Sequence, residues 1–200
     1  MTRQQVVVLG AGHGTRMGTP KIFARAGGRT FLEHILDRCR ETAHPVTLVI
    51  DPNHRAQVLE LLEGLPSDDP QLVEADGKAP MLASLQAALK SGGCEEGFWC
   101  WPVDAPFLSP AGWVQAVEAA EGMPEVIWKP SSGGETGHPV WFPGWAVARI
   151  LKGSWPNGLL GLLDECADQI YVLELEGEDL RDFNTPEQLA SHTGPGEEIV

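Results

Sequence analysis

A short apolar run that leads directly into a glycine-rich loop sets the first limit on how this chain folds. Residues 6–21 read VVVLGAGHGTRMGTPK, with the apolar run ending at Leu9 and glycines recurring from Gly10 onward. A continuous β-branched run is typical of a parallel strand that is buried on both faces. Glycine lets a backbone approach a ligand closely, the exposed N–H groups of such a loop bind anions, and Arg16 and Lys21 add two positive charges. The segment therefore predicts a polyphosphate site at the end of the first strand.

The loop matches neither of two common phosphate-binding patterns. The dinucleotide pattern G-x-G-x-x-G, counted from Gly10, needs its third glycine where Thr15 stands. The P-loop pattern needs a lysine between glycine and Ser or Thr, whereas Lys21 follows Pro20. A glycine-rich turn without a ligand is the plain alternative, and it is disfavoured because a bare turn needs neither of the two cations.

Composition limits the class of protein and its partners. At 200 residues the chain is expected to form one domain over residues 1–192, followed by a flexible tail over residues 193–200. The apolar stretches are too short to span a membrane and no signal peptide is expected, so we expect a cytoplasmic protein without a membrane partner. The four cysteines have neither CxxC nor metal-ligand spacing. The net charge of −14 disfavours a nucleic-acid partner and favours a divalent metal as the bridge to a polyphosphate.

Strands and helices alternate along the first two thirds of the chain. Apolar runs predict strands over residues 6–9, 46–50, 71–75, 98–103 and 125–129. Helical patterns lie between them, and the first begins at the capping box Thr30-x-x-Glu33. This alternation predicts a parallel α/β sheet with helices on both faces. Ligands of such sheets bind outside the carboxyl ends of the strands.

The last third is less regular. Its patterns predict a strand over 137–142, for which an antiparallel orientation is considered, helices over 144–151 and 158–166, and a strand over 170–175. The segment Thr185-Pro186-Glu187-Gln188 predicts a second capping box and a short last helix. Three tryptophans also fall in this part, and core packing is favoured for them over stacking on a flat ligand: Trp141, Trp145 and Trp155.

A carboxylate follows the predicted strand 98–103 directly. Asp104 stands in the sequence Pro102-Val103-Asp104-Ala105-Pro106, where the two prolines stiffen the backbone. At the ligand edge of the sheet a bare carboxylate would repel bound phosphates. It becomes useful if Mg²⁺ lies between them, because Mg²⁺ is bound by one or two carboxylates together with phosphate oxygens and water. The alternative is an aspartate that caps a turn, and the cationic loop favours the metal.

A second polar group lies near the end of the chain. In the sequence Asp182-Phe183-Asn184 the polar side chains alternate with an aromatic one, so both are expected to face the same way while Phe183 packs inward. Either Asp182 or Asn184 is a candidate second ligand for the metal. Capping of the last helix by Thr185 is expected in either case.

In combination these segments resemble the MobA-like nucleotidyltransferases, a family that includes the molybdenum cofactor cytidylyltransferases and guanylyltransferases. Residues 9–21 look like its signature L-x-(A/G)-G-x-(G/S)-x-R-M-G-x-x-K, with a departure at Gly10-Ala11. Residues 102–106 look like its P-x-D-x-P motif and residues 182–187 like its late D-x-(D/N)-T-P-E motif. The resemblance implies a three-layer α/β/α, Rossmann-like (GT-A-like) nucleotidyltransferase fold with a mostly parallel sheet. It also implies a nucleotide-binding half up to about residue 110 and an acceptor-binding half over residues 111–192.

The resemblance also carries over to individual residues. Gly137-His138-Pro139 looks like the G-H-P motif of the cytidylyltransferase branch, which lies near the acceptor pocket, so His138 and Asn184 are the expected acceptor-binding residues. The expected catalytic residues are Arg16, Lys21 and Asp104, and the expected metal ligands are Asp104, Asp182 and Asn184. The expected nucleotide-binding residues are Leu9, Gly10, Ala11, Gly12, His13, Gly14, Thr15, Arg16, Lys21 and Ser84, whereas Met81 and Leu82 are expected in the core of a helix.

These residues together predict a Mg²⁺-dependent nucleotidyltransferase. A phosphate of the acceptor attacks the α-phosphorus of a nucleoside triphosphate and pyrophosphate leaves, so positioning and charge neutralisation supply the catalysis. The resemblance implies molybdopterin cofactor as acceptor, and the G-H-P motif favours CTP as donor. A sugar phosphate or polyol phosphate is the alternative acceptor. An escort protein of a molybdoenzyme, which binds nucleotide or cofactor without turnover, is the alternative of another class.

Overall fold

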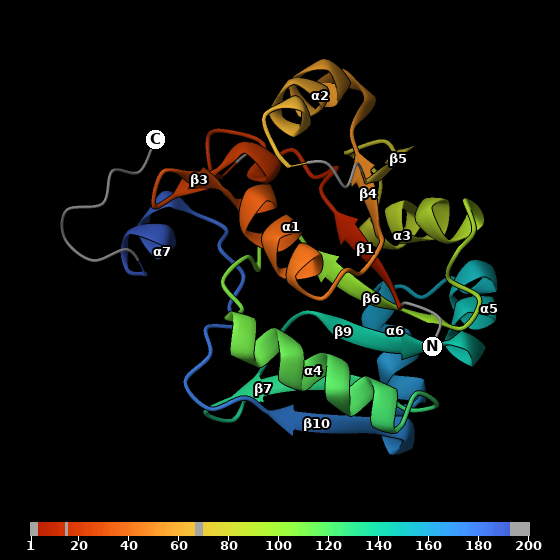
Figure 1. The fold of residues 1–200 in the computed structure, drawn as a ribbon. Helices are drawn as coiled ribbons and strands as arrows, with labels where there is room; N and C mark the ends of the chain where they lie inside the picture. Colours follow the sequence, from red (N-terminus) through yellow and green to blue (C-terminus); the bar gives the residue numbers. More distant parts are fainter. Residues whose placement is uncertain (1–3, 15, 67–69, 193–200) are drawn as a thin grey trace.

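The computed structural model describes residues 4–14, 16–66 and 70–192, and within them the chain is built on one large sheet (Figure 1). Strand β1 (Gln5–Leu9) lies inside this sheet, between β4 (Val46–Ile50) and β6 (Gly97–Pro102). The order is β10-β7-β9-β6-β1-β4-β5, with β8 (Glu135–Thr136) paired to β7. The remaining strands are β5 (Gln71–Glu74), β7 (Ile127–Ser132), β9 (Val140–Pro143) and β10 (Ile170–Glu174).

The sheet is mostly parallel, as predicted. β1 pairs in parallel with both β4 and β6, β4 with β5, and β10 with β7. β9 runs antiparallel to both β6 and β7, the orientation considered for this strand from the sequence. The carboxyl ends of the parallel strands therefore share one edge, and β9 begins at that same edge.

Helices cover both faces of the sheet, so the predicted three-layer α/β/α fold is confirmed. On one face α1 (Phe31–Glu41), α2 (Arg55–Glu63) and α4 (Pro110–Gly122) pack against the inward side chains that alternate along β1, such as Val6 and Val8. On the other face α3 (Met81–Lys90), α5 (Gly144–Lys152) and α6 (Leu159–Glu165) pack against the next residue of the strand, Val7. Figure 1 shows α1 and α4 in front of the sheet.

The helix starts follow the local sequence signals. Thr30 and Glu33 form the predicted capping box of α1, and Thr185 with Gln188 forms that of α7 (Pro186–Ala190). The apolar side chains of α1 are all buried. Pro80 lies at the N-cap of α3.

Several smaller elements complete the fold. Short 3₁₀ helices cover η1 (Lys21–Phe23), η2 (Pro52–His54) and η3 (Ala167–Gln169). β2 (Arg25–Ala26) and β3 (Arg29–Thr30) form a separate antiparallel pair. Within the described residues no helix has the length and apolarity to cross a membrane. The predicted tail 193–200 lies outside the described residues, and the division into two halves stays a prediction.

The tryptophans lie mainly in the core. Trp141 is 2% exposed and its Nε1 donates to the Pro124 carbonyl. Trp145 and Trp155 are partly buried and pack against the core of the α3–α5–α6 face. The favoured core interpretation is therefore confirmed for Trp141, because its ring is enclosed by the sheet and α4.

Candidate functional site

Three segments far apart in the sequence meet at the carboxyl edge of the sheet. The Lys21 ammonium donates to Asp104 Oδ2 at 2.5 Å and to Asn184 Oδ1 at 2.6 Å. Arg16 reaches the same Asn184 oxygen at 3.2 Å. Lys21 ends the loop after β1, Asp104 follows β6, and Asn184 precedes α7. The ammonium is thus held between a carboxylate and an amide oxygen, at the point where the sequence predicts a phosphate and metal site.

The path of the loop depends on particular glycines. Gly14 has φ = +57°, and a Cβ there would collide with the Thr19 carbonyl, so the backbone accepts only glycine. Its carbonyl accepts a hydrogen bond from the Met17 N–H at 2.8 Å and closes the turn that leads to Lys21. Gly12 is different, because no described atom lies within 4 Å of a Cβ built on it. Packing does not require glycine at position 12, and the open space beside it faces a cavity.

That first cavity has a volume of about 270 Å³ and runs from the loop to the start of α3. Seven of the ten expected nucleotide-binding residues line it: Leu9, Ala11, Gly12, Gly14, Arg16, Lys21 and Ser84. The other two expected nucleotide-binding residues that the structure describes, Gly10 and His13, do not line this cavity. Gly10 packs against Ile22, and His13 turns towards Asp51. Thr15 lies outside the described residues.

The wall of the first cavity also contains residues that the sequence reasoning missed. They are Gly77, Ala79, Met81, Pro102 and Val103, which join Asp104 and Asn184 there. Met81 was expected in a helix core, and this expectation is wrong: its side chain is 46% exposed at the first residue of α3. Leu82, the next residue, is buried as expected. The first turn of α3 extends to the sheet edge, where an apolar side chain meets a cavity instead of the core.

A second cavity, of about 450 Å³, lies on the side of β7 and β9. It is lined by Lys129, Ser132, Glu135, Thr136, Gly137, His138, Glu178, Asp179, Leu180, Arg181 and Asp182. Asp182 therefore lies in a different cavity from Asn184, and the expectation that both face the same way is wrong. The segment is not a strand. The Phe183 N–H donates a hydrogen bond to the Asp104 carbonyl at 2.8 Å. The buried ring of Phe183 separates the side chains of Asp182 and Asn184.

The electrostatics link the two cavities. The pKa of Asp182 is raised by the protein around its carboxyl and by the neighbouring charge of Asp104, although the residue as a whole is exposed. Burial lowers the pKa of His138, against the opposing effect of Asp182 and Asp104. His138 Nδ1 is buried and, among the described residues, has no hydrogen-bond partner. Such an atom is costly unless a ligand or water satisfies it.

The oxygen donors at this edge fit a divalent cation. Asp104 and Asn184 converge on a positive charge that Lys21 supplies. Carboxylate and amide oxygens are hard ligands of the kind that Mg²⁺ takes, usually with several waters retained. Asp182 adds a second carboxylate, whose pKa is raised first by burial and then by the nearby charge of Asp104. Asp104 with Asn184 or Asp182 is therefore a suitable donor set.

The fold and the site define a nucleotide-binding α/β protein of the transferase type, with a cationic glycine-rich loop opposite an aspartate at the carboxyl edge of its sheet. Residues 6–169 match the model of the MobA-like NTP transferase domain, and the chain belongs to this family. The resemblance that the motifs suggested is thereby confirmed.

Two curated relatives show local similarity. A probable molybdenum cofactor guanylyltransferase of Rhodopirellula baltica is 32% identical over 126 residues, which cover 60% of this chain and 57% of the relative. A bifunctional protein GlmU of Xanthobacter autotrophicus is 34% identical over 91 residues, which cover 44% of this chain and 20% of the relative. The matches thus span only about a fifth to three fifths of these relatives.

Solved structures share the fold over nearly the whole chain. Rv0371c of Mycobacterium tuberculosis superposes with a TM-score of 0.80 at 22% identity, covering 96% of this chain and 98% of that one. The inositol-1-phosphate CTP transferase of T. maritima superposes with a TM-score of 0.76 at 16% identity, covering 98% of each chain. At these identities the likeness shows the fold alone.

Proposed function

We propose that this protein transfers a nucleoside monophosphate from a nucleoside triphosphate, preferably CTP, to the phosphate of molybdopterin cofactor, with Mg²⁺. The observation that carries the proposal is the position of Lys21 against Asp104 and Asn184, at the edge of a cavity lined by the glycine-rich loop. Family membership supports a nucleotide substrate. The curated relative from R. baltica supports the acceptor by its name.

The chain's own groups account for phosphate binding. Gly12, Gly14, Arg16 and Lys21 line the space that the triphosphate would occupy, where loop N–H groups and the two cations would bind its phosphates. Asp104 and Asn184 hold Lys21 by hydrogen bonds, which position its ammonium at the edge of this space. Bound Mg²⁺, held by Asp104 with Asn184 or Asp182, supplies further neutralisation of phosphate charge.

The transfer step needs little more than alignment. An oxygen of the acceptor phosphate forms a bond to the α-phosphorus, the bond from the α-phosphorus to the bridging oxygen breaks, and pyrophosphate leaves. The attacking oxygen is already an anion, so no general base is required. The second cavity borders Asp104 through Asp182 and His138, and an acceptor there would approach the phosphates from the side of β9. His138 lines this cavity, and its buried Nδ1 has no hydrogen-bond partner among the described residues.

The lining of the second cavity favours a second candidate acceptor, a sugar phosphate or polyol phosphate. Among the described residues that line it only His138 carries an aromatic ring, so a flat pterin would find a single imidazole and no Phe, Tyr or Trp to stack on. Four carboxylates and two hydroxyls, together with Lys129 and Arg181, instead suit a molecule with several hydroxyls and one phosphate. The fold shared with the inositol-1-phosphate CTP transferase is compatible with such an acceptor.

A non-catalytic escort protein for a molybdoenzyme is disfavoured, because binding alone would not require Asp104 beside the phosphate cations. A cytoplasmic location and the absence of nucleic-acid and membrane partners belong to the proposal as well. The escort and the enzyme differ in a simple readout, which is the release of pyrophosphate.

The test measures pyrophosphate release in the presence of Mg²⁺. Each of the four NTPs is combined first with molybdopterin cofactor and then with each member of a panel of sugar and polyol phosphates. Release with CTP and molybdopterin supports the proposal, and release with GTP moves the protein to the guanylyl branch. Release with a sugar or polyol phosphate alone establishes the second acceptor. Tight nucleotide binding without release with any acceptor would overturn the enzymatic proposal in favour of the escort.

A further inference from the structure

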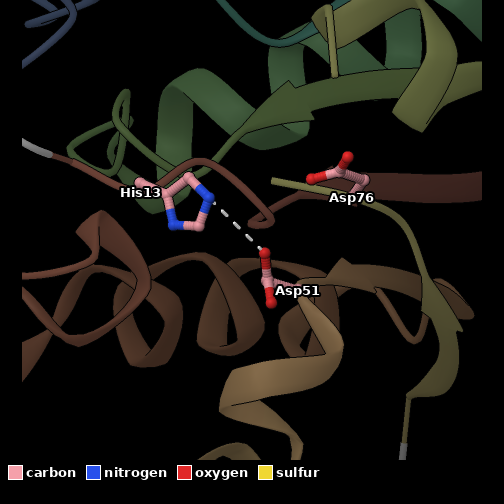
Figure 2. A group of neighbouring side chains, drawn as sticks. All are labelled: His13, Asp51 and Asp76. Carbon is pink, nitrogen blue, oxygen red and sulfur yellow. Dashed lines mark ion pairs between the residues drawn. The ribbon is translucent and has the colours of Figure 1, made fainter. Parts of the chain in front are cut away.

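His13, Asp51 and Asp76 form a group beside the first cavity but do not line it (Figure 2). His13 lies in the loop after β1, Asp51 directly follows β4, and Asp76 follows β5. One potential ligand atom of each side chain lies within 4.8 Å of those of the other two. Figure 2 shows the His13 ring and the Asp51 carboxylate facing each other, with Asp76 to one side.

Asp51 is a buried carboxylate that is held in its charged form. It is 2% exposed, and its Oδ1 accepts hydrogen bonds from the N–H and the side-chain amide of Asn53 at 2.8 and 2.7 Å. Its Oδ2 accepts the Gly77 N–H at 3.0 Å. These hydrogen bonds, led by that from the Asn53 backbone, keep the pKa of Asp51 below its usual value. One lone pair of Oδ2 remains for a cation.

The His13 ring points at that oxygen without bonding to it. Nε2 lies 3.7 Å from Asp51 Oδ2, which is too long for a hydrogen bond. The atom is nevertheless buried and, within the described part of the chain, has no hydrogen-bond partner. A direct hydrogen bond between histidine and aspartate would bring Nε2 and Oδ2 closer than 3.7 Å. Two ligand atoms of one metal ion, each about 2.1 Å from the metal, are normally about 3–4 Å apart, and the observed distance lies in that range.

The backbone closes one side of the group. A Cβ on Gly77 would lie 2.6 Å from Asp51 Oδ2 and 3.0 Å from His13 Nε2, so no larger residue fits there. Asp76 closes another side from an exposed position, with one oxygen accepting the Lys78 N–H at 2.9 Å. Because its side chain is exposed, it can move the roughly 1–2 Å that separate a spacing of up to 4.8 Å from the spacing of metal-bound ligand atoms.

We propose that His13, Asp51 and Asp76 bind a divalent transition-metal ion of the Zn²⁺, Co²⁺ or Mn²⁺ class, at a site separate from the Mg²⁺ ligands. One imidazole and two carboxylates are a donor set for these ions, whereas Mg²⁺ prefers oxygen ligands alone. The bound ion links the loop after β1 to the ends of β4 and β5. It thereby fixes the loop that carries Gly12 and Gly14 relative to the opposite wall at Gly77.

The test uses the full chain, freed of metal with a chelator and titrated with Co²⁺ and with Zn²⁺ in the absence of nucleotide. We expect one equivalent to bind and Co²⁺ to show the visible absorption of a nitrogen- and oxygen-ligated ion. His13→Gln and Asp76→Asn each remove one ligand from a partly exposed position and should weaken binding about 100-fold or more, since even outer partners of metal ligands contribute 10- to 100-fold.

Two control variants make the outcome specific. Asp168→Asn removes an exposed carboxylate on η3 and should leave Zn²⁺ binding unchanged. Asp104→Asn alters the Mg²⁺ donor set and should also leave it unchanged. Zn²⁺ affinity that is unaffected by His13→Gln and Asp76→Asn, or lost with Asp104→Asn, would overturn the inference. Because no nucleotide is present, the result does not depend on whether the proposed transfer takes place.

Discussion

Replacing Lys21 by alanine tests the phosphate site most directly. Its side chain is only 15% exposed and its ammonium lies 2.5 Å from Asp104 Oδ2, so solvent screens the charge weakly. With phosphates bound, one charge about 4 Å away at an effective dielectric constant near 20 contributes about 4 kcal/mol. Removing one preorganised donor to a transferring group costs about 10²–10³ in rate, which agrees with that figure. We therefore expect kcat/KM of Lys21→Ala to fall about 300- to 1,000-fold.

The fold should tolerate this change. Asp104 is 20% exposed and keeps access to water after its partner is removed, so the free energy of unfolding should fall by no more than about 1 kcal/mol. The assay measures pyrophosphate release together with thermal unfolding of the same preparation. Lys90→Ala, an exposed lysine on α3, is the control for the same change in net charge. A kcat/KM within threefold of the unmodified protein, in a folded Lys21→Ala variant, would refute the phosphate-site reasoning.

Three further predictions concern the metal, acid stability and a cysteine. Asp104→Asn should remove the Mg²⁺ dependence of nucleotide binding measured by titration calorimetry, and unchanged Mg²⁺ dependence would place the metal elsewhere. Asp179 has its pKa lowered to about 2, mainly by the Arg181 hydrogen bond, so its stabilising effect is complete above about pH 4 and is lost as the pH falls towards 2. Asp179→Asn should therefore lower the unfolding temperature at pH 7 and flatten its decline between pH 4 and 2; an identical acid profile would contradict this. Burial raises the pKa of the Cys39 thiol, which keeps it neutral at pH 7, so Cys39→Ser should leave kcat unchanged in folded protein, and a large loss of turnover would show a role that we exclude.

The sequence predicted the framework well because its signals are local. The apolar run of β1 and the capping box at Thr30 are read from adjacent residues, and the structure confirms both. The mostly parallel sheet follows from the alternation of strands and helices. In the site, the strand ends brought Lys21 and Asp104 to one edge, as the rule for parallel sheets predicts.

The parts that the sequence did not reveal depend on contacts between distant segments. Met81 has the spacing of a core residue, and only the position of α3 at the sheet edge exposes it. Alternation placed Asp182 and Asn184 together, whereas a backbone bond to Asp104 separates them. Asp51 was not among the candidate residues, although it follows an apolar strand as directly as Asp104 does. That shared position was the signal that could have pointed to it.

The antiparallel strand β9 has a consequence for how such a protein can diversify. Because β9 is antiparallel to its neighbours, its first residues lie at the same edge of the sheet as the last residues of the parallel strands. The last residue of β7 and the connection to β9, residues 132–139, therefore supply five residues to the second cavity and none to the first. Insertions or substitutions in this short hairpin can reshape one cavity while the loop after β1 stays unchanged. A scaffold with this division can acquire a new partner molecule for its second cavity by exchange of a single segment.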